Sequence, residues 1–143
     1  MRSIHYYIFL EQVEIACSLF FRRKNMKFDY FYGPQSEGFS FYRVPKVLVK
    51  DRQFHPLSPL SKLLYGLLLD RMSLSLQNNW YDKKGRAYVY YTISEISEDF
   101  GCSRVTAAKL LAELDSSSGI GLIERQKQGQ GKPDRIYVMR FCL

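Results

Sequence analysis

The chain has 143 residues, of which 46% are hydrophobic and 15% aromatic, so it can bury a core of its own and is not a disordered segment. No stretch supplies the roughly 20 consecutive apolar residues that a helix needs to cross a bilayer, which excludes a membrane span. The 21 Lys and Arg residues against 14 Asp and Glu give a net charge of +7, which suits a polyanionic partner without identifying one.

The cysteines indicate a protein of a reducing compartment. Cys17, Cys102 and Cys142 form no CxxC pair and leave an odd number, so neither a disulfide framework nor a metal site is expected. The apolar run at residues 4–10 stops at Glu11 without a signal-peptide cleavage site. We therefore expect a cytoplasmic protein that uses no metal and no cofactor.

The N-terminal third divides into two segments. Residues 1–25 carry scattered apolar side chains and a basic cluster without caps or turns; we interpret them as an extension outside the native fold, with a basic partner-docking helix as the alternative. Residues 26–56 read as an extended aromatic arm, with a β-prone run at 39–44 that Pro45 ends. The arm either folds onto its own domain or adds to a second subunit through an exposed strand edge.

A helix is predicted to begin at Ser58, which can cap it, with Pro59 in the first helical position and Asn78-Asn79 as its end. Its large side chains form two stripes at helical spacing. The first stripe contains Leu60, Leu63, Leu64, Leu67 and Leu68, and the second contains Tyr65, Leu69, Met72 and Leu76. Two apolar faces require cover on both sides, by the arm or by another subunit, and we therefore expect a homodimer.

A turn at residues 82–85 and a short strand at 87–91 precede a pair of helices. Thr92 and Glu95 form a capping box that starts the first helix, and Gly101 ends it in a left-handed conformation. Ile93, Ile96 and Phe100 form its inner face. Because only residues 101–103 join it to the next helix, the pair is typical of a helix-turn-helix.

The second helix of the pair has an apolar side and a small, basic side. Ala107, Leu110, Leu111 and Leu114 fall on the apolar face, and Val105, Lys109 and Ala112 lie opposite. The N-terminal end of this helix carries Ser103, which caps it, together with Arg104 and Thr106. It is the positive end of the helix dipole, which attracts phosphates. This pattern is typical of a recognition helix that enters a major groove with its N-terminal residues nearest the bases.

A basic hairpin follows. Residues 120–125 and 136–141 are predicted to pair as antiparallel strands around a loop that has no apolar side chain apart from Pro133. Long polar side chains in such a loop suit phosphate and groove-edge contacts. The order of elements predicts an α+β fold, a winged helix-turn-helix over residues 57–143 behind the aromatic arm.

Five segments of the chain are more distinctive than this general pattern. They are FYRVPK (41–46), SKLLYGLLLDRMSLS (61–75), NWYD (79–82), GLIER (121–125) and GQGKPDRIYV (129–138). In these segments the chain resembles the N-terminal domain of the replication initiator protein A (RepA) family of Gram-positive plasmids and related mobile elements. The resemblance extends over about residues 39–141.

The resemblance implies a winged-helix domain that dimerises, binds repeated double-stranded DNA sites in a plasmid origin and starts replication with proteins of the replication machinery. It implies a recognition helix at 103–115 in the major groove and a basic wing at 125–136 on the backbone or minor groove. The DNA-binding residues that it implies are Ser103, Arg104, Thr106, Lys109, Lys127, Gln128, Gln130, Lys132 and Arg135. Family members usually continue into a C-terminal domain, so a truncated initiator and a DNA-binding regulator both stay open.

An enzyme is not expected. The histidines are His5 and His55, and the Gly129–Lys132 segment lacks the hydroxyl residue and helix of a nucleotide phosphate loop. The alternatives to origin binding are a winged-helix transcriptional regulator and a winged-helix protein-interaction module. Salt dependence separates the last from the first two, because phosphate contacts release counterions.

Overall fold

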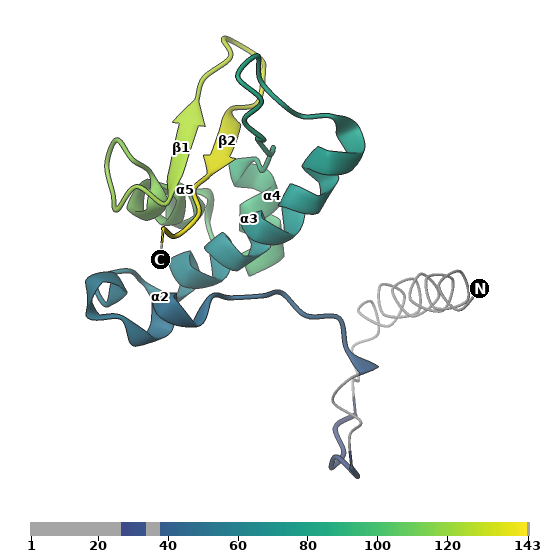
Figure 1. Cartoon of the computed structure of the whole chain (residues 1–143). Coiled ribbons are helices and arrows are strands. Elements are labelled where there is room, and N and C mark those ends of the chain that lie inside the picture. Colours follow the sequence, from purple (N-terminus) through teal and green to yellow (C-terminus); the bar gives the residue numbers. More distant parts are fainter. Residues whose placement is uncertain (1–26, 34–37, 143) are drawn as a thin grey trace, which may run out of the picture. The chain divides into compact units, whose positions relative to one another are not determined.

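The computed structural model describes residues 27–33 and 38–142, in two compact units with their boundary between Phe41 and Tyr42 (Figure 1). The predicted extension at residues 1–25 lies outside the described residues, and the division into 1–25, 26–56 and 57–143 stays a prediction. In the first unit, residues 27–33 and 39–41 form neither helix nor strand. The Phe39 ring meets Phe31 and Phe41 edge to face, with centroids 6.0 Å and 6.3 Å apart.

The segment that precedes the long helix differs from the extended arm of the prediction. Residues 39–44 form no strand, and they are followed by the short helix α2 (Lys46–Lys50) and the 3₁₀ turn η2 (Arg52–Phe54), neither of which was predicted. Leu48 and Phe54 are buried in the core of the second unit. This part of the expected arm therefore packs onto the winged-helix unit, where single apolar side chains anchor helical turns too short to show a period.

Helix α3 (Pro59–Asn78) begins and ends as predicted, with the Ser58 side chain accepting the amide of Ser61 and Asn79 in the left-handed region. Leu64, Tyr65, Leu67 and Leu68 are buried. Leu60 and Leu63 are 41% and 38% exposed, and Leu76 is 69% exposed. The two stripes are therefore covered only in part within this unit, where Gly66 lies against Val44 and Leu69 and Met72 pack against the core. Cover of the exposed leucines by another subunit stays a prediction.

Helix α4 (Ile93–Phe100) and helix α5 (Arg104–Leu114) form the expected helix-turn-helix. The capping box of Thr92 and Glu95 is present, and Gly101 adopts φ 60° and ends α4. Both ends of the intervening turn are fixed, because the Ser97 hydroxyl donates to the Cys102 carbonyl at 2.6 Å and Ser103 caps α5. The predicted apolar face of α5 is buried in full.

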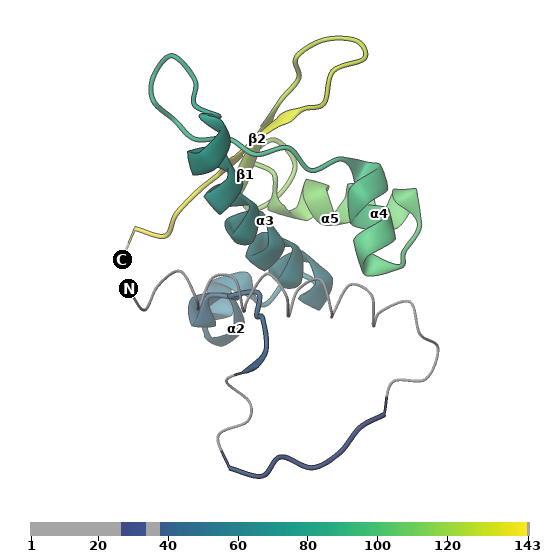
Figure 2. The ribbon, with the colours of Figure 1, turned by 90° about the vertical axis from the view of Figure 1, so that its right-hand side faces the viewer.

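The wing is a two-stranded antiparallel sheet of β1 (Ile123–Gln126) and β2 (Arg135–Val138), in which Ile123 pairs with Val138. Figures 1 and 2 show α3, α4 and α5 grouped beside this hairpin, whose loop projects beyond them. The predicted strand at residues 87–91 is reduced to two isolated antiparallel bridges, one from Ala87 to Tyr81 and one from Val89 to Ile136. Both strands of the wing are shorter than the predicted 120–125 and 136–141. The first starts late because the chain turns after α5, where the Gly119 amide donates to the Asp115 carbonyl at 2.7 Å.

Candidate nucleic-acid interface

Helix α5 is held by its buried face and by its C-terminal end. The Glu113 carboxylate accepts hydrogen bonds from the Ser61 hydroxyl at 2.6 Å and from the hydroxyl and amide of Ser58 at 2.9 Å and 3.0 Å. Burial alone would raise the pKa of Glu113, but these hydrogen bonds outweigh it and lower the pKa. One carboxylate thus joins the last turn of α5 to the first turn of α3.

A second carboxylate connects α5 with the wing. Asp115, 3% exposed, caps the helix and accepts a 2.6 Å hydrogen bond from Nε of Arg125 in β1. The Arg125 side chain opposes the effect of burial and lowers the pKa of Asp115. Arg125, which the sequence placed at the start of the basic wing, is therefore paired with an acid inside the protein.

The side of α5 that faces away from the core carries the predicted recognition residues. Ser103, Arg104 and Lys109 are exposed, and Val105 between them is 67% exposed. Thr106 is half-buried, and its hydroxyl lies 3.0 Å from that of Ser103. The outer surface of α5 is thus small and basic, which lets the helix approach a groove closely.

The wing loop carries the predicted polar side chains in two different environments. Lys127, Gln130 and Lys132 are exposed. Gln128 is half-buried, and its amide donates to the Pro133 carbonyl at 2.7 Å and to the Tyr90 hydroxyl at 3.3 Å. Gln128 therefore closes the mouth of the loop, whereas the two lysines are available to a partner.

Arg135 lies at the base of the wing rather than at its tip. Its guanidinium lies over the Tyr88 ring, 4.6 Å from the centroid, and within the described part of the chain its Nε is buried without a hydrogen-bond partner. A hydrogen bond with the Tyr90 side chain raises the pKa of Arg135. The structure gives this residue a packing contact that the charge pattern did not indicate, and its role as a DNA contact stays a prediction.

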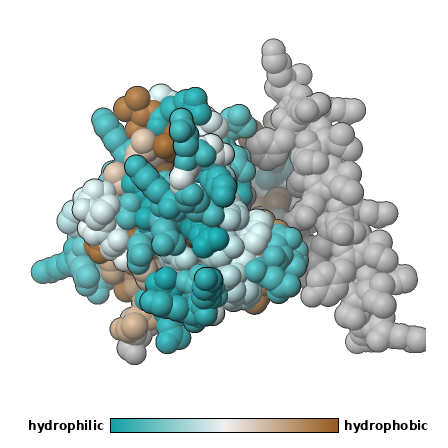
Figure 3. All heavy atoms as spheres, turned by 90° about the horizontal axis from the view of Figure 1, so that it is seen from above, coloured by the Kyte–Doolittle hydropathy of each residue, from teal (hydrophilic) through white to brown (hydrophobic). Residues whose placement is uncertain are grey.

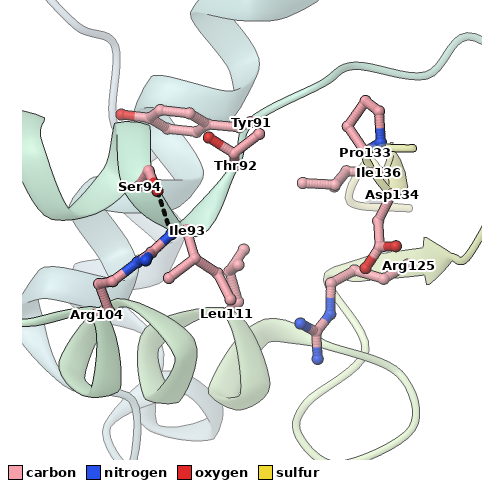
Figure 4. Close-up of a pocket in the computed structure, with 10 residues that line it drawn as sticks. All are labelled: Tyr91, Thr92, Ile93, Ser94, Arg104, Leu111, Arg125, Pro133, Asp134 and Ile136. Carbon is pink, nitrogen blue, oxygen red and sulfur yellow. Dashed lines mark hydrogen bonds between the residues drawn. The ribbon is translucent and has the colours of Figure 1, made fainter. Parts of the chain in front are cut away.

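A pocket of about 190 Å³ brings α5 and the wing together (Figure 4). Arg104 and Leu111 line it from α5, and Pro133 and Asp134 line it from the wing. The Arg104 guanidinium donates to the Ser94 hydroxyl of α4, which directs it across the turn of the helix pair. The N-terminal end of α5 and the wing therefore border one hollow on one side of the molecule.

Three basic residues outside the predicted site lie close to it. Lys83, Lys84 and Arg86 lie in the turn after α3, beside the base of the wing. In the sequence these residues predict a turn and nothing more. Its position next to β2 depends on long-range contacts that spacing does not reveal.

Metal-binding clusters and membrane-spanning helices are absent from the part of the chain that the structure describes. No group of His, Cys, Asp and Glu side chains there could hold a metal ion. None of the described helices has the length and apolar character needed to cross a membrane.

Comparison with known proteins identifies relatives of this unit. Residues 40–143 match the family described as the replication initiator protein A (RepA) N-terminus. A 41 kDa protein of Lactobacillus helveticus is 36% identical over 108 residues, which make up 70% of this chain and 29% of that protein. The chain thus matches less than a third of the length of this curated relative.

Solved structures show the same fold. A structure described as the N-terminal domain of a DNA binding protein is 27% identical, with a TM-score of 0.63 over 82% of this chain and 87% of that chain. One described as a Rep–DNA complex is 28% identical, with a TM-score of 0.63 over 80% and 86% of the two chains. One described as an MDR initiator is 25% identical, with a TM-score of 0.62 over 80% and 88%.

Proposed function

This chain belongs to the family of replication initiator protein A (RepA) N-termini, and we propose on that premise that it binds double-stranded DNA in the origin of a plasmid-type replicon. Helix α5 reads base edges in the major groove, with Ser103, Arg104, Thr106 and Lys109 nearest the DNA. The wing contacts the adjacent backbone or minor groove through Lys127, Gln130 and Lys132. The Rep–DNA complex among the similar structures supports this assignment.

The observation that carries the proposal is the pocket shared by α5 and the wing. Arg104 and Asp134 line the same hollow, so a single duplex can meet the helix and the loop at once. The buried face of α5 leaves its other side to the partner, and the lysines of the wing carry no ion pair among the described residues. A fixed helix beside a basic loop supplies both base readout and phosphate attraction.

The finer parts of the proposal concern the whole protein. A homodimer fits repeated origin sites, and the exposed Leu60 and Leu63 on α3 supply apolar surface for a subunit contact. Replication-machinery proteins are further partners, the compartment is the cytoplasm, and we expect no enzymatic activity. Light scattering on the full chain measures the oligomeric state directly.

Selection of bound sites from a pool of random duplexes tests the proposal. We expect a defined sequence to emerge, present as repeats in a replication origin. Contact with roughly six phosphates makes binding about a thousandfold weaker between 50 and 200 mM salt. Absence of any selected sequence together with a flat salt response contradicts DNA binding and favours a protein-interaction module; a single site at a promoter favours a transcriptional regulator.

Two sets of variants separate recognition of the DNA sequence from electrostatic attraction to the DNA phosphates. Arg104→Ala should change which duplexes are selected, because it removes a side chain at the end of α5 nearest the bases. Lys127→Ala with Lys132→Ala should weaken all duplexes alike and reduce the salt dependence by about one unit of slope for each phosphate that the protein no longer neutralises. An unchanged sequence preference in the Arg104→Ala variant contradicts the assignment of α5 as the recognition helix.

A further inference from the structure

The turn at residues 82–86, hereafter the basic turn, is rigidly built around one carboxylate. Oδ1 of Asp82 accepts hydrogen bonds from the amides of Lys84 and Arg86, both at 2.9 Å, and Oδ2 accepts a hydrogen bond from Nε of Arg86 at 2.7 Å. Burial opposes these bonds, but their combined effect lowers the pKa of Asp82 to about 2. The carboxylate therefore stays ionised and holds Lys83 and Lys84 on an exposed, ordered turn.

The basic turn is attached to the wing. The Tyr137 hydroxyl of β2 lies 3.3 Å from Oδ2 of Asp82, and the Arg86 guanidinium lies 4.7 Å from the centroid of the Tyr137 ring. Lys83 and Lys84 share a hollow of about 240 Å³ with Arg135 at the base of the wing. The turn and the wing thus form one structural unit, although about fifty residues separate them in the chain.

Strand alternation places the basic turn across the wing from α5. Side chains at successive positions of a strand point to opposite faces of the sheet. Arg125 and Ile136 line the pocket toward α5, whereas their neighbours Gln126, Arg135 and Tyr137 line the hollow toward the basic turn. The wing therefore stands between the recognition helix on one face and a second group of cations on the other.

The two loops also share an end of the molecule. Figures 1 and 2 show the segment between α3 and α4 and the wing loop projecting from the same end of the unit. Seen from that end, in Figure 3, the coloured surface is mainly hydrophilic with small hydrophobic patches. Lys83, Lys84, Arg86 and Arg135 outnumber the acids near them, Asp82 and Glu124, and Asp82 is already paired within the turn.

We propose that the basic turn is a second phosphate-binding element, which holds the DNA backbone on the side of the wing opposite α5. Lys83 and Lys84 make the contacts, and Asp82 and Tyr137 orient the turn that carries them. The interface then runs from α5 through the wing to the basic turn, longer than a helix and a wing alone provide. This inference rests on the proposed DNA binding and extends its footprint.

The test compares two variants that lose the same charge. Lys83→Ala/Lys84→Ala removes the proposed contacts, and Lys46→Ala/Lys50→Ala removes two exposed lysines of α2, which lies at the other end of the unit in Figure 1. Binding to the selected duplex, extended on the wing side to about three helical turns, is measured by fluorescence anisotropy over a salt series. Circular dichroism confirms that both variants fold.

We expect the Lys83→Ala/Lys84→Ala variant to bind about 10- to 100-fold more weakly at 50 mM salt, with a salt slope smaller by about 1.8, while the α2 variant stays close to the unsubstituted chain. Shortening the duplex on the wing side should abolish the difference between the Lys83→Ala/Lys84→Ala variant and the unsubstituted chain. Equal losses in both variants, or no loss in either, overturn the inference while leaving origin binding intact. Failure of the unsubstituted chain to bind any duplex overturns the proposed function itself.

Discussion

Helix α5 and the wing loop meet the same hollow but are held in different ways. The helix buries Ala107, Leu110, Leu111 and Leu114, and Glu113 fastens its end to α3. The loop is held at its mouth by Gln128, and its lysines are exposed. The difference matches two tasks: base readout requires a helix oriented before the partner arrives, whereas attraction to phosphates tolerates side chains that find their partners on contact.

The largest effect should come from the buried face of α5. Leu114→Ala should lower the free energy of unfolding by about 3 kcal/mol, because a fully buried leucine leaves a cavity. Val105→Ala, on the exposed side of the same helix, should change it by less than about 0.5 kcal/mol. Urea unfolding measures both, and similar losses would contradict the description of α5 as packed on one side only.

The next effect concerns the end of α5. Glu113→Ala should cost about 2 kcal/mol of unfolding free energy, because the hydroxyl of the fully buried Ser61 loses its close acceptor. Glu98→Ala, on the exposed side of α4, is the matched control and should have little effect. Equal stability of the two variants would show that the hydrogen bonds to α3 do not hold the helix.

A fall in pH should also weaken the attachment of this end of α5, with a smaller loss of stability than Glu113→Ala. Because the folded protein lowers the pKa of Glu113, its contribution to stability is fully present above the ordinary pKa of a glutamate and is lost as the pH falls through the lowered value. Unfolding free energy should therefore be level above about pH 5 and decline below about pH 4. Urea unfolding of Glu113→Gln over the same range should show a shallower decline; an identical pH profile would contradict this origin.

Substitutions of Arg135, at the base of the wing, test whether this residue acts through its packing or through its charge. Arg135→Ala and Arg135→Lys should each cost about 1 kcal/mol of stability, because lysine lacks the planar group that lies on the Tyr88 ring. Urea unfolding and duplex binding are measured on both variants. Full stability of the lysine variant, with unchanged affinity for duplex DNA, would indicate instead that Arg135 acts as a phosphate contact.

The smallest effect on stability belongs to the tip of the wing. Lys127→Ala with Lys132→Ala should leave the unfolding free energy within about 0.5 kcal/mol of the unsubstituted chain, because both side chains are exposed. Thermal unfolding measures the change. A marked destabilisation would show that the loop contributes to the core, and the contrast with α5 would disappear.

The features that the sequence predicted correctly depend on local chemistry. Ser58, Thr92, Gly101 and Ser103 each act within one helical turn, and each occupies the predicted cap. The apolar face of α5 follows from a period that the backbone imposes. The family resemblance is confirmed by the match over residues 40–143, and the winged-helix fold by the similar structures.

The features that the sequence did not predict depend on distant partners. Helix α2 has five residues and only one buried side chain, Leu48, so the sequence there has no helical period that would predict it. The strand at 87–91 is reduced to two isolated bridges, in which Ala87 meets Tyr81 and Val89 meets Ile136 of β2, and the local β-prone pattern specifies neither partner. In the sequence Arg135 resembles the other cations of the wing, and only the fold shows that its guanidinium lies over the Tyr88 ring.

The hydrogen bond from Gln128 to Pro133 holds the two ends of the wing loop together. The length of the loop beyond this bond can therefore change without a change in the register of the two strands. The Gln128 amide reaches the Pro133 carbonyl across the mouth, and beyond it a side-chain carbon at Gly129 or Gly131 would meet no atom within 4 Å. Insertions at the tip should therefore leave the hydrophobic core undisturbed. The exposed Gln130 between these glycines offers an attachment point for a spectroscopic label, because Gly129 and Gly131 themselves have φ angles of 113° and 76° that disfavour a side chain. The tip is also a place where related domains can diverge in reach without a rebuilt core.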